Sequence, residues 1–189
     1  MATAAVEARA GTTYTPAGGP SVRLVGTSIS ITDVPAGQTI TCNQFDIAGT
    51  VESPGSVRTF GSAAVDLGAL TYFRCTNPVM GPMPVTVDPA WSLDITGPAT
   101  GTTWPAVVNH VNMRLAMANC DLRLAGTMPG VFDTATQRFT PTYAASTLVL
   151  TSVVGSMCVT LDWQVGDQMS FGGYLTNVPP AGSTPLSLT

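Results

Sequence analysis

The sequence predicts an all-β fold, an antiparallel β-sandwich or β-barrel built from two similar strand units that are each clasped by a disulfide. Short apolar or alternating runs recur through residues 21–178, and Gly, Pro, Asn or Asp breaks them roughly every ten residues, which is typical of these folds. No segment shows a long helical period, so we expect little helix. Four cysteines and a weak internal repeat complete the argument.

The clearest strand covers residues 107–117, where apolar and polar residues alternate. Strand side chains point to opposite faces in turn, so we expect one set to point inward: Val107, Val111, Met113, Leu115 and Met117. The other set is expected to point outward: Val108, His110, Asn112, Arg114 and Ala116.

Further strands are predicted on the same grounds at 22–31, 44–51, 67–73, 85–95, 122–128, 138–143, 147–154 and 168–175. The polar run from Asp133 to Gln137 separates Phe132 from Phe139 and is expected to be a hairpin loop.

The internal repeat suggests how the cysteines pair. A strand opened by Cys42 reaches Ala48-Gly49-Thr50, and one opened by Cys120 reaches Ala125-Gly126-Thr127. A turn and a returning strand then lead to the next cysteine in each case. Four cysteines allow three connectivities, and the repeat favours Cys42–Cys75 and Cys120–Cys158.

The cysteines could instead be metal ligands or buried free thiols. No Cys-x-x-Cys pair occurs and there is a single histidine, which argues against zinc. An even cysteine count in an acidic chain rich in Gly, Pro and Thr fits an oxidising compartment. We therefore expect a secreted or cell-surface protein whose signal peptide is not part of this sequence, with a cytosolic protein as the alternative.

The composition narrows the function further. Only 10% of the residues are charged, Lys is absent, and the net charge is −4. Nucleic-acid binding needs clustered basic residues, so nucleic acid is not an expected partner, and no stretch is long and apolar enough to predict a transmembrane helix. Residues 1–20 are expected to be a flexible N-terminal arm, 21–178 a single all-β domain, and 179–189 a C-terminal tail.

Several short motifs resemble a family of small secreted actinobacterial β-proteins of unassigned function. The similarity spans about residues 27–178 and rests on their order: Thr41-Cys42, Gly49-Thr50-Val51, Tyr72-Phe73-Arg74-Cys75, Pro82–Val87, Ala90-Trp91-Ser92-Leu93, Asn119-Cys120, Gly126-Thr127 and Gly166–Tyr174. The resemblance implies an exported β-protein with two disulfides and implies no activity. The chain departs from the family pattern at Met117-Ala118-Asn119, before the third cysteine.

Catalytic signatures are missing from the sequence. His110 falls on the polar parity of its strand, and no Gly-x-Ser-x-Gly elbow accompanies it. The eleven acidic residues form no marked pair for glycoside hydrolysis and no calcium loop. No Gly-rich phosphate loop is found. We therefore expect no enzyme activity, no catalytic residue, no metal site and no cofactor.

The tryptophans and methionines are candidate contact residues. Trp91 lies on the apolar parity of its strand and is expected in the core, whereas Trp104, between Thr103 and Pro105, is the candidate for an exposed contact in a loop. The methionines are expected to fill irregular gaps in the core, although Met also lines adaptable apolar surfaces. This set is Met80, Met83, Met113, Met117, Met128, Met157 and Met169.

These observations predict a non-enzymatic structural or interaction protein that associates with itself, as an oligomer or filament, or with a cell-envelope component. Few charges and unpaired β-edges would favour such association. The alternative is an extracellular carrier that holds an apolar small molecule inside a barrel or between two sheets.

Overall fold

The computed structural model describes residues 12–117, 119–143 and 146–189. It is all-β, with 64% of the chain in strands and one short helix. The first nine strands are β1 (Thr13–Tyr14), β2 (Pro16–Gly19), β3 (Ser21–Gly26), β4 (Ile29–Asp33), β5 (Thr39–Val51), β6 (Arg58–Thr59), β7 (Ser62–Asn77), β8 (Gly81–Met83) and β9 (Val85–Val87).

The second half of the chain continues the pattern. It contains β10 (Trp91–Ile95), β11 (Thr103–Met117), β12 (Cys120–Asp133), β13 (Arg138–Pro141), β14 (Val149–Val154), α1 (Ser156–Thr160), β15 (Met169–Gly172), β16 (Leu175–Asn177) and β17 (Thr184–Leu188). The hairpin loop predicted at 133–137 is present, and Asp133 stabilises it by accepting a hydrogen bond from the Ala135 amide at 2.9 Å.

Eight antiparallel strands close into a barrel in the order β3-β16-β13-β12-β11-β10-β7-β5, and β5 pairs back to β3. The all-β prediction is therefore confirmed, and of the two architectures considered the barrel is the observed one. Closure joins strands through hydrogen bonds all the way round and leaves the barrel without free edges.

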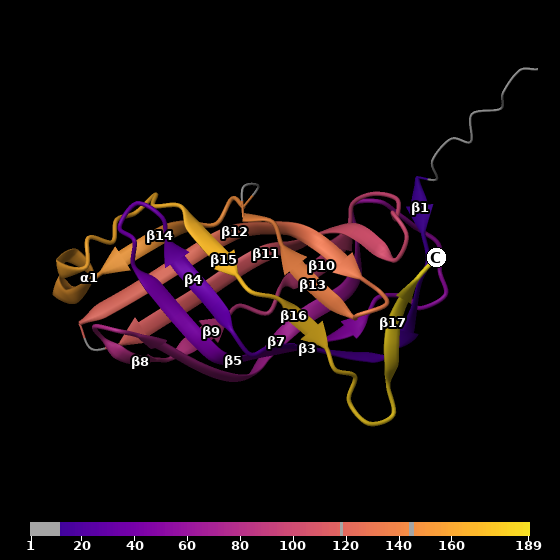
Figure 1. Ribbon diagram of the computed structural model, residues 1–189, viewed down its shortest axis with the longest axis horizontal. Helices are drawn as coiled ribbons and strands as arrows, with labels where there is room; N and C mark the ends of the chain where they lie inside the picture. The colour runs from indigo at the N-terminus through magenta and orange to yellow at the C-terminus, as the bar shows by residue number, and fades with distance from the viewer. Residues whose placement is uncertain (1–11, 118, 144–145) are drawn as a thin grey trace, which may run out of the picture.

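Four long strands extend beyond the barrel, and each changes its partner on the way. Toward one end the long strands pair with barrel strands: β5 with β3, β7 and β11 both with β10, and β12 with β13. Toward the other end β5 pairs with β4, β7 with β8, β11 with β9 and β12 with β14. Figure 1 shows the long strands running through the molecule toward α1 and β8. We call the part built by the second set of partners the disulfide half.

The buried side chains of both halves form one hydrophobic cluster. Phe132 and Phe139 are fully buried in the barrel strands, while Leu115 and Leu122 are fully buried in the disulfide half. The long strands therefore carry a continuous core from one half to the other.

The predicted alternation in β11 holds for only part of the strand. Val111, Met113 and Leu115 are buried as expected. Val108 was expected outward but is 1% exposed, and Trp104 and Ala106 are buried with it. The cause is a β-bulge between Val108 and Val111, where His110 takes a positive φ of 57°. One extra residue at the bulge moves the inward parity from even to odd positions.

The chain ends differ from the arm and tail that the sequence predicted. Residues 13–19 form β1 and β2, and Tyr14 is 1% exposed. Residues 184–188 form β17, which pairs with β2 and buries Leu186. The two ends meet at Thr15 and Thr189, whose backbones exchange hydrogen bonds of 2.7 and 3.2 Å. The two segments form strands because each supplies hydrogen bonds to the other. Residues 1–11 of the predicted arm lie outside the described residues.

Candidate functional site

Both disulfides lie in the disulfide half, and their pairing is the sequential one that the repeat favoured. Cys42 and Cys75 face each other across β5 and β7, with a Cα–Cα distance of 3.9 Å. Cys120 opens β12 and is bonded to Cys158 in α1. In the described part of the chain no cysteine is free, so these residues act as covalent clasps and supply no reactive thiol.

Trp104 is not the exposed loop residue that the sequence indicated. It lies in β11, opposite Phe132 of β12, and is 8% exposed. Thr103 and Pro105 gave the segment the appearance of a loop, but Pro105 is tolerated here because strand pairing continues on both sides of it. Trp91 is buried as expected, and its indole N–H donates to the Asn112 carbonyl at 3.3 Å.

The sequence also missed three buried carboxyl groups. Asp33, Asp46 and Asp94 are 0%, 4% and 5% exposed. Each accepts one local hydrogen bond, from the Ala36 amide, the Gln44 side chain and the Asn109 side chain respectively. In a sequence, a buried strand carboxyl can be recognised only as a polar residue at a position that the alternation places inward. A bulge changes which positions point inward and so hides this sign.

Asp33 is the carboxyl whose acidity changes most clearly. Burial raises the pKa of Asp33 to about 6, and the neighbouring Asp167 and Asp162 side chains add to the rise, while the hydrogen bond from the Ala36 amide opposes it. The second carboxyl oxygen of Asp33 is buried and has no partner. Asp33 also closes the turn to Gly37, whose amide donates to its carbonyl at 2.9 Å. This geometry gives Asp33 a structural role with a titration near neutral pH.

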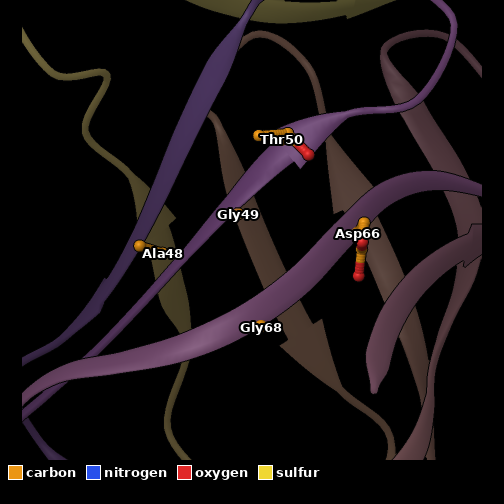
Figure 2. Close-up of a pocket in the computed structure, with 5 residues that line it drawn as sticks. All are labelled: Ala48, Gly49, Thr50, Asp66 and Gly68. Carbon is orange, nitrogen blue, oxygen red and sulfur yellow. The ribbon is translucent and has the colours of Figure 1, made fainter. Parts of the chain in front are cut away.

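A hollow of about 300 Å³ lies on β5 and β7 and is drawn in Figure 2. Its lining residues are Ala48, Gly49, Thr50, Asp66 and Gly68. Gly49 allows β5 to approach β7 closely, because a Cβ on Gly49 would lie 2.2 Å from the Asp66 carbonyl oxygen. Asp66 contributes the one carboxylate of this lining, whereas paired acid–base chemistry needs two titratable groups. The lining therefore contains no pair of carboxylates.

A larger hollow of about 440 Å³ lies where β7 meets β8, and its lining is mostly apolar. Phe73, Met83, Pro82 and Pro84 form its apolar part. Arg74 lines it as well, and this guanidinium donates to the Tyr72 hydroxyl at 3.2 Å. The combination of an aromatic ring, two prolines and one cation can accept an apolar group that carries a polar end.

The tip of the disulfide half, which we call the disulfide end, consists of residues 72–84, 116–117, 119–120 and 153–161. Exposed apolar side chains gather there, namely Tyr72, Phe73, Val79, Val154 and Val159. The segments 75–87, 115–120 and 152–161 contain no charged residue and no histidine. The absence of charge in these three segments is therefore a signal for this surface in the sequence. The composition of the whole chain does not show it, because it averages over all residues.

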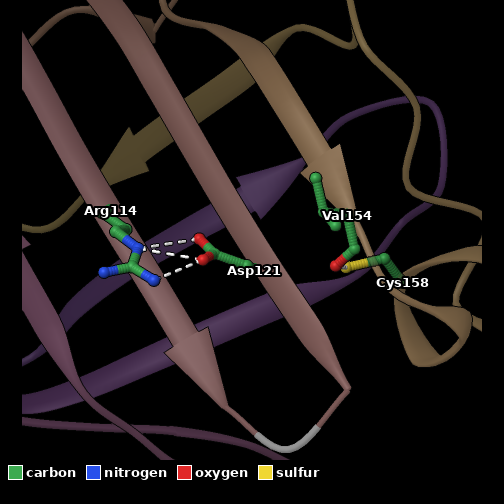
Figure 3. A network of polar contacts seen from close by, with 4 residues as sticks. All are labelled: Arg114, Asp121, Val154 and Cys158. Carbon is green, nitrogen blue, oxygen red and sulfur yellow. Dashed lines mark hydrogen bonds and ion pairs between the residues drawn. The ribbon is translucent and has the colours of Figure 1, made fainter.

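Arg114 and Asp121 form the nearest ion pair to this tip. Figure 3 shows the pair on neighbouring strands β11 and β12, with Val154 and Cys158 beside it. The Arg114 Nε lies 3.0 Å from both Asp121 carboxylate oxygens, and the hydrogen bond to Arg114 lowers the pKa of Asp121. Each charge of this pair is matched by the other, while Arg123 lies opposite Arg114 on β12.

Within the described residues, no group of three His, Cys, Asp or Glu side chains is placed to hold a metal ion. None of the helical residues described forms a segment long and apolar enough to cross a bilayer. Comparison with protein-family models, with curated proteins and with solved structures gave no match. The chain is thus a small all-β protein with two disulfides and an eight-stranded antiparallel barrel, and its function must be argued from its own surface.

Proposed function

We propose that this chain is a secreted, non-enzymatic structural or interaction protein that works by association with itself or with a component of the cell envelope. The observation that carries the proposal is the disulfide end, where Val79 and Val159 are 62% and 74% exposed and the stretches 75–87 and 152–161 around them contain no charged residue. Contiguous apolar surface that faces water is characteristic of interaction sites.

In the part of the chain that the structure describes, the barrel and the N-terminal strands offer no free edge for the strand addition considered from the sequence, and the open edges of the sheet are those of β8 and β15. The barrel is closed, and β2, a strand within the expected arm, is already paired with β17. Backbone groups that are hydrogen-bonded within the chain are not free to recruit another strand. Association is therefore proposed to occur through side chains of the disulfide end, which bury apolar area on contact.

Sedimentation velocity over a wide concentration range tests this proposal. Val159→Ser, combined with Phe73→Ser, removes apolar surface at the disulfide end. Val57→Ser is the matched control, because Val57 is 71% exposed but lies in the loop before β6, outside the disulfide end. We expect the wild-type protein and the control to associate and the double variant to shift toward monomer. A strict monomer at high concentration, with or without residues 1–20, would refute self-association, and failure to bind envelope fractions as well would refute the proposal.

Export and family membership are parts of the same proposal. Two disulfides are compatible with an extracellular protein, and the resemblance to secreted actinobacterial β-proteins would give the chain the same compartment. Thiol titration of protein recovered from its native cells tests the compartment directly. We expect no reactive thiols without denaturant and reductant; four titratable thiols in freshly lysed cells would place the chain in a reducing compartment.

A second candidate function is the binding of an apolar small molecule. The barrel strands fill the interior with buried side chains, so the observation in favour is the hollow beside Phe73, whose 440 Å³ falls within the usual range for ligand sites. Mass spectrometry of solvent extracts from native protein, with Phe73→Ser for comparison, tests this candidate. A ligand recovered from the wild type and lost from the variant would support it, and clean extracts with no displacement of a hydrophobic dye would exclude it.

A further inference from the structure

Three methionines from distant parts of the sequence line one open hollow at the disulfide end. Met80 follows β7, Met117 ends β11, and Met157 lies in α1. With Val79 and Asn119 they line about 300 Å³. The three side chains are half-buried, so they pack against the core yet remain open to solvent.

The fold holds all three methionines on fixed supports. Met117 pairs with Cys120, and the Cys120–Cys158 disulfide anchors the residue that follows Met157. The Met157 amide also donates to the Asn119 carbonyl at 3.1 Å. On the third side, the Met80 amide donates to the Asn77 side chain at 3.1 Å. Asn77 is itself 1% exposed and donates to the Thr39 carbonyl.

We propose that this hollow is a binding site for a soft monovalent metal ion, Cu(I) or Ag(I), with the thioether sulfurs of Met80, Met117 and Met157 as ligands. Thioethers are soft, neutral donors that favour Cu(I), whereas zinc prefers thiolate or imidazole and calcium prefers oxygen ligands. The three segments that form the hollow contain no carboxylate and no histidine, and both nearby cysteines are in a disulfide. The three thioethers therefore favour a soft ion, and Asn119 is the one side chain of this lining that offers a hard oxygen donor.

Pre-organisation favours binding at this place. A flexible chain must order several side chains before three sulfurs can meet, and this ordering costs conformational entropy. Here the backbone supports are in position before the ion arrives, so only side-chain rotations remain. Met83, Met113, Met128 and Met169 are each 1% exposed, so they are shielded from solvent and provide controls inside the same molecule.

The test uses protein labelled with ¹³C at the methionine methyl groups and titrated with silver nitrate in chloride-free buffer. Ag(I) serves as a stable probe for Cu(I), and the two disulfides are left intact. We expect saturation at one ion per chain, with changes in the methyl signals of Met80, Met117 and Met157 and none in the four buried methionines. Zinc nitrate is expected to leave all of these signals in place.

Substitution supplies the second arm of the test. Met80→Leu, Met117→Leu and Met157→Leu keep the apolar surface but remove a sulfur each, so self-association should persist while affinity for Ag(I) falls. Each loss should be at least about tenfold, since even mutation of a group that merely orients a metal ligand costs that much. Met169→Leu is the control.

Absence of saturable binding to the wild-type protein would overturn the inference, as would equal changes at every methionine or an unchanged affinity in the triple variant. The wild-type spectra decide the question even if a variant fails to fold. Because leucine preserves the apolar tip, a protein that binds Ag(I) without associating, or associates without binding Ag(I), would separate this inference from the proposed function.

Discussion

Removal of the two disulfides, one at a time, tests how the covalent clasps stabilise this fold. The two double variants are Cys42→Ala with Cys75→Ala, and Cys120→Ala with Cys158→Ala. The first bridge closes a loop of 33 residues and the second a loop of 38. Because the two loops do not overlap in sequence, their effects on the unfolded chain should be independent.

The magnitude follows from the loop lengths. In the chain-entropy relation, loops of this size give about 3.7 and about 3.9 kcal/mol of stabilisation at 25 °C. Each loss corresponds to a fall in melting temperature of roughly 8–16 °C for a chain of this size. Removal of both bridges would then cost about 7–8 kcal/mol, which is comparable with the whole free energy of unfolding of a typical domain, about 5–15 kcal/mol.

Urea denaturation followed by tryptophan fluorescence measures the change, because Trp91 and Trp163 are buried reporters from different parts of the chain. Each double variant should lower the free energy of unfolding by about 3–4 kcal/mol, and the quadruple variant should be largely unfolded without urea. In the second variant, amide exchange at Leu161 and Trp163 should also accelerate, since these amides donate to carbonyls in α1. A fall of less than about 1 kcal/mol in either double variant would refute the argument from loop entropy.

Two further predictions concern single positions. Asp33 has a pKa of about 6 in the folded protein, above its ordinary value of 3.8. Its contribution to stability is therefore fully present below about pH 4 and is lost as the pH rises through 6. Between pH 4 and pH 7 the stability of Asp33→Asn should thus gain about 1–3 kcal/mol relative to that of the wild type, and parallel stability curves for the two proteins would contradict this. Gly49→Ala should destabilise the folded protein by about 1–3 kcal/mol, because the new Cβ would lie 2.2 Å from the Asp66 carbonyl oxygen. Gly68→Ala is the control and should be nearly neutral in the same thermal melt, since the nearest neighbour of its Cβ would be 3.9 Å away. Equal melting temperatures for the two variants would show that β5 and β7 can separate to make room.

The strands were predictable from sequence where alternation is unbroken. The predicted strand at 44–51 lies inside β5, and the one at 122–128 lies inside β12. Long strands were underestimated, since β7 covers Ser62–Asn77 where only 67–73 was expected. The alternation is broken at the start of β7, where the adjacent Ala64 and Val65 are both buried beside a register shift in β10.

Bulges account for the errors in parity. In β11 the register shift between Val108 and Val111 reverses the inward face within a single strand. A period-2 pattern assumes that no residue is inserted, and His110 gives no local sign of its positive φ. Trp104 was misplaced for a related reason, because its burial depends on the even parity that holds only before the bulge.

The candidate site was less predictable because it depends on contacts between distant segments. The sequence separates Met80 from Met157 by most of the second half of the chain, and only the fold brings both to one hollow. The charge-free segments around them could be seen beforehand. Their meeting at one tip could not, because it depends on which partner each long strand adopts beyond the barrel.

The position of the disulfides now has a physical explanation. The barrel is a closed ring of hydrogen-bonded strands, whereas β4, β8, β9 and β14 of the disulfide half lie outside that ring and have three to six residues each. Both covalent bonds therefore lie in the half that this ring does not close. Each closed loop nevertheless leaves the disulfide half, passes through barrel strands and returns, the first through β5 and β7 and the second through β12 and β13, with β14 on the way back. Each disulfide therefore lowers the conformational entropy of an unfolded segment whose residues belong to both halves of the folded protein. Since the long strands and the core are shared as well, loss of either bridge should weaken the barrel and the disulfide half together in a single cooperative transition.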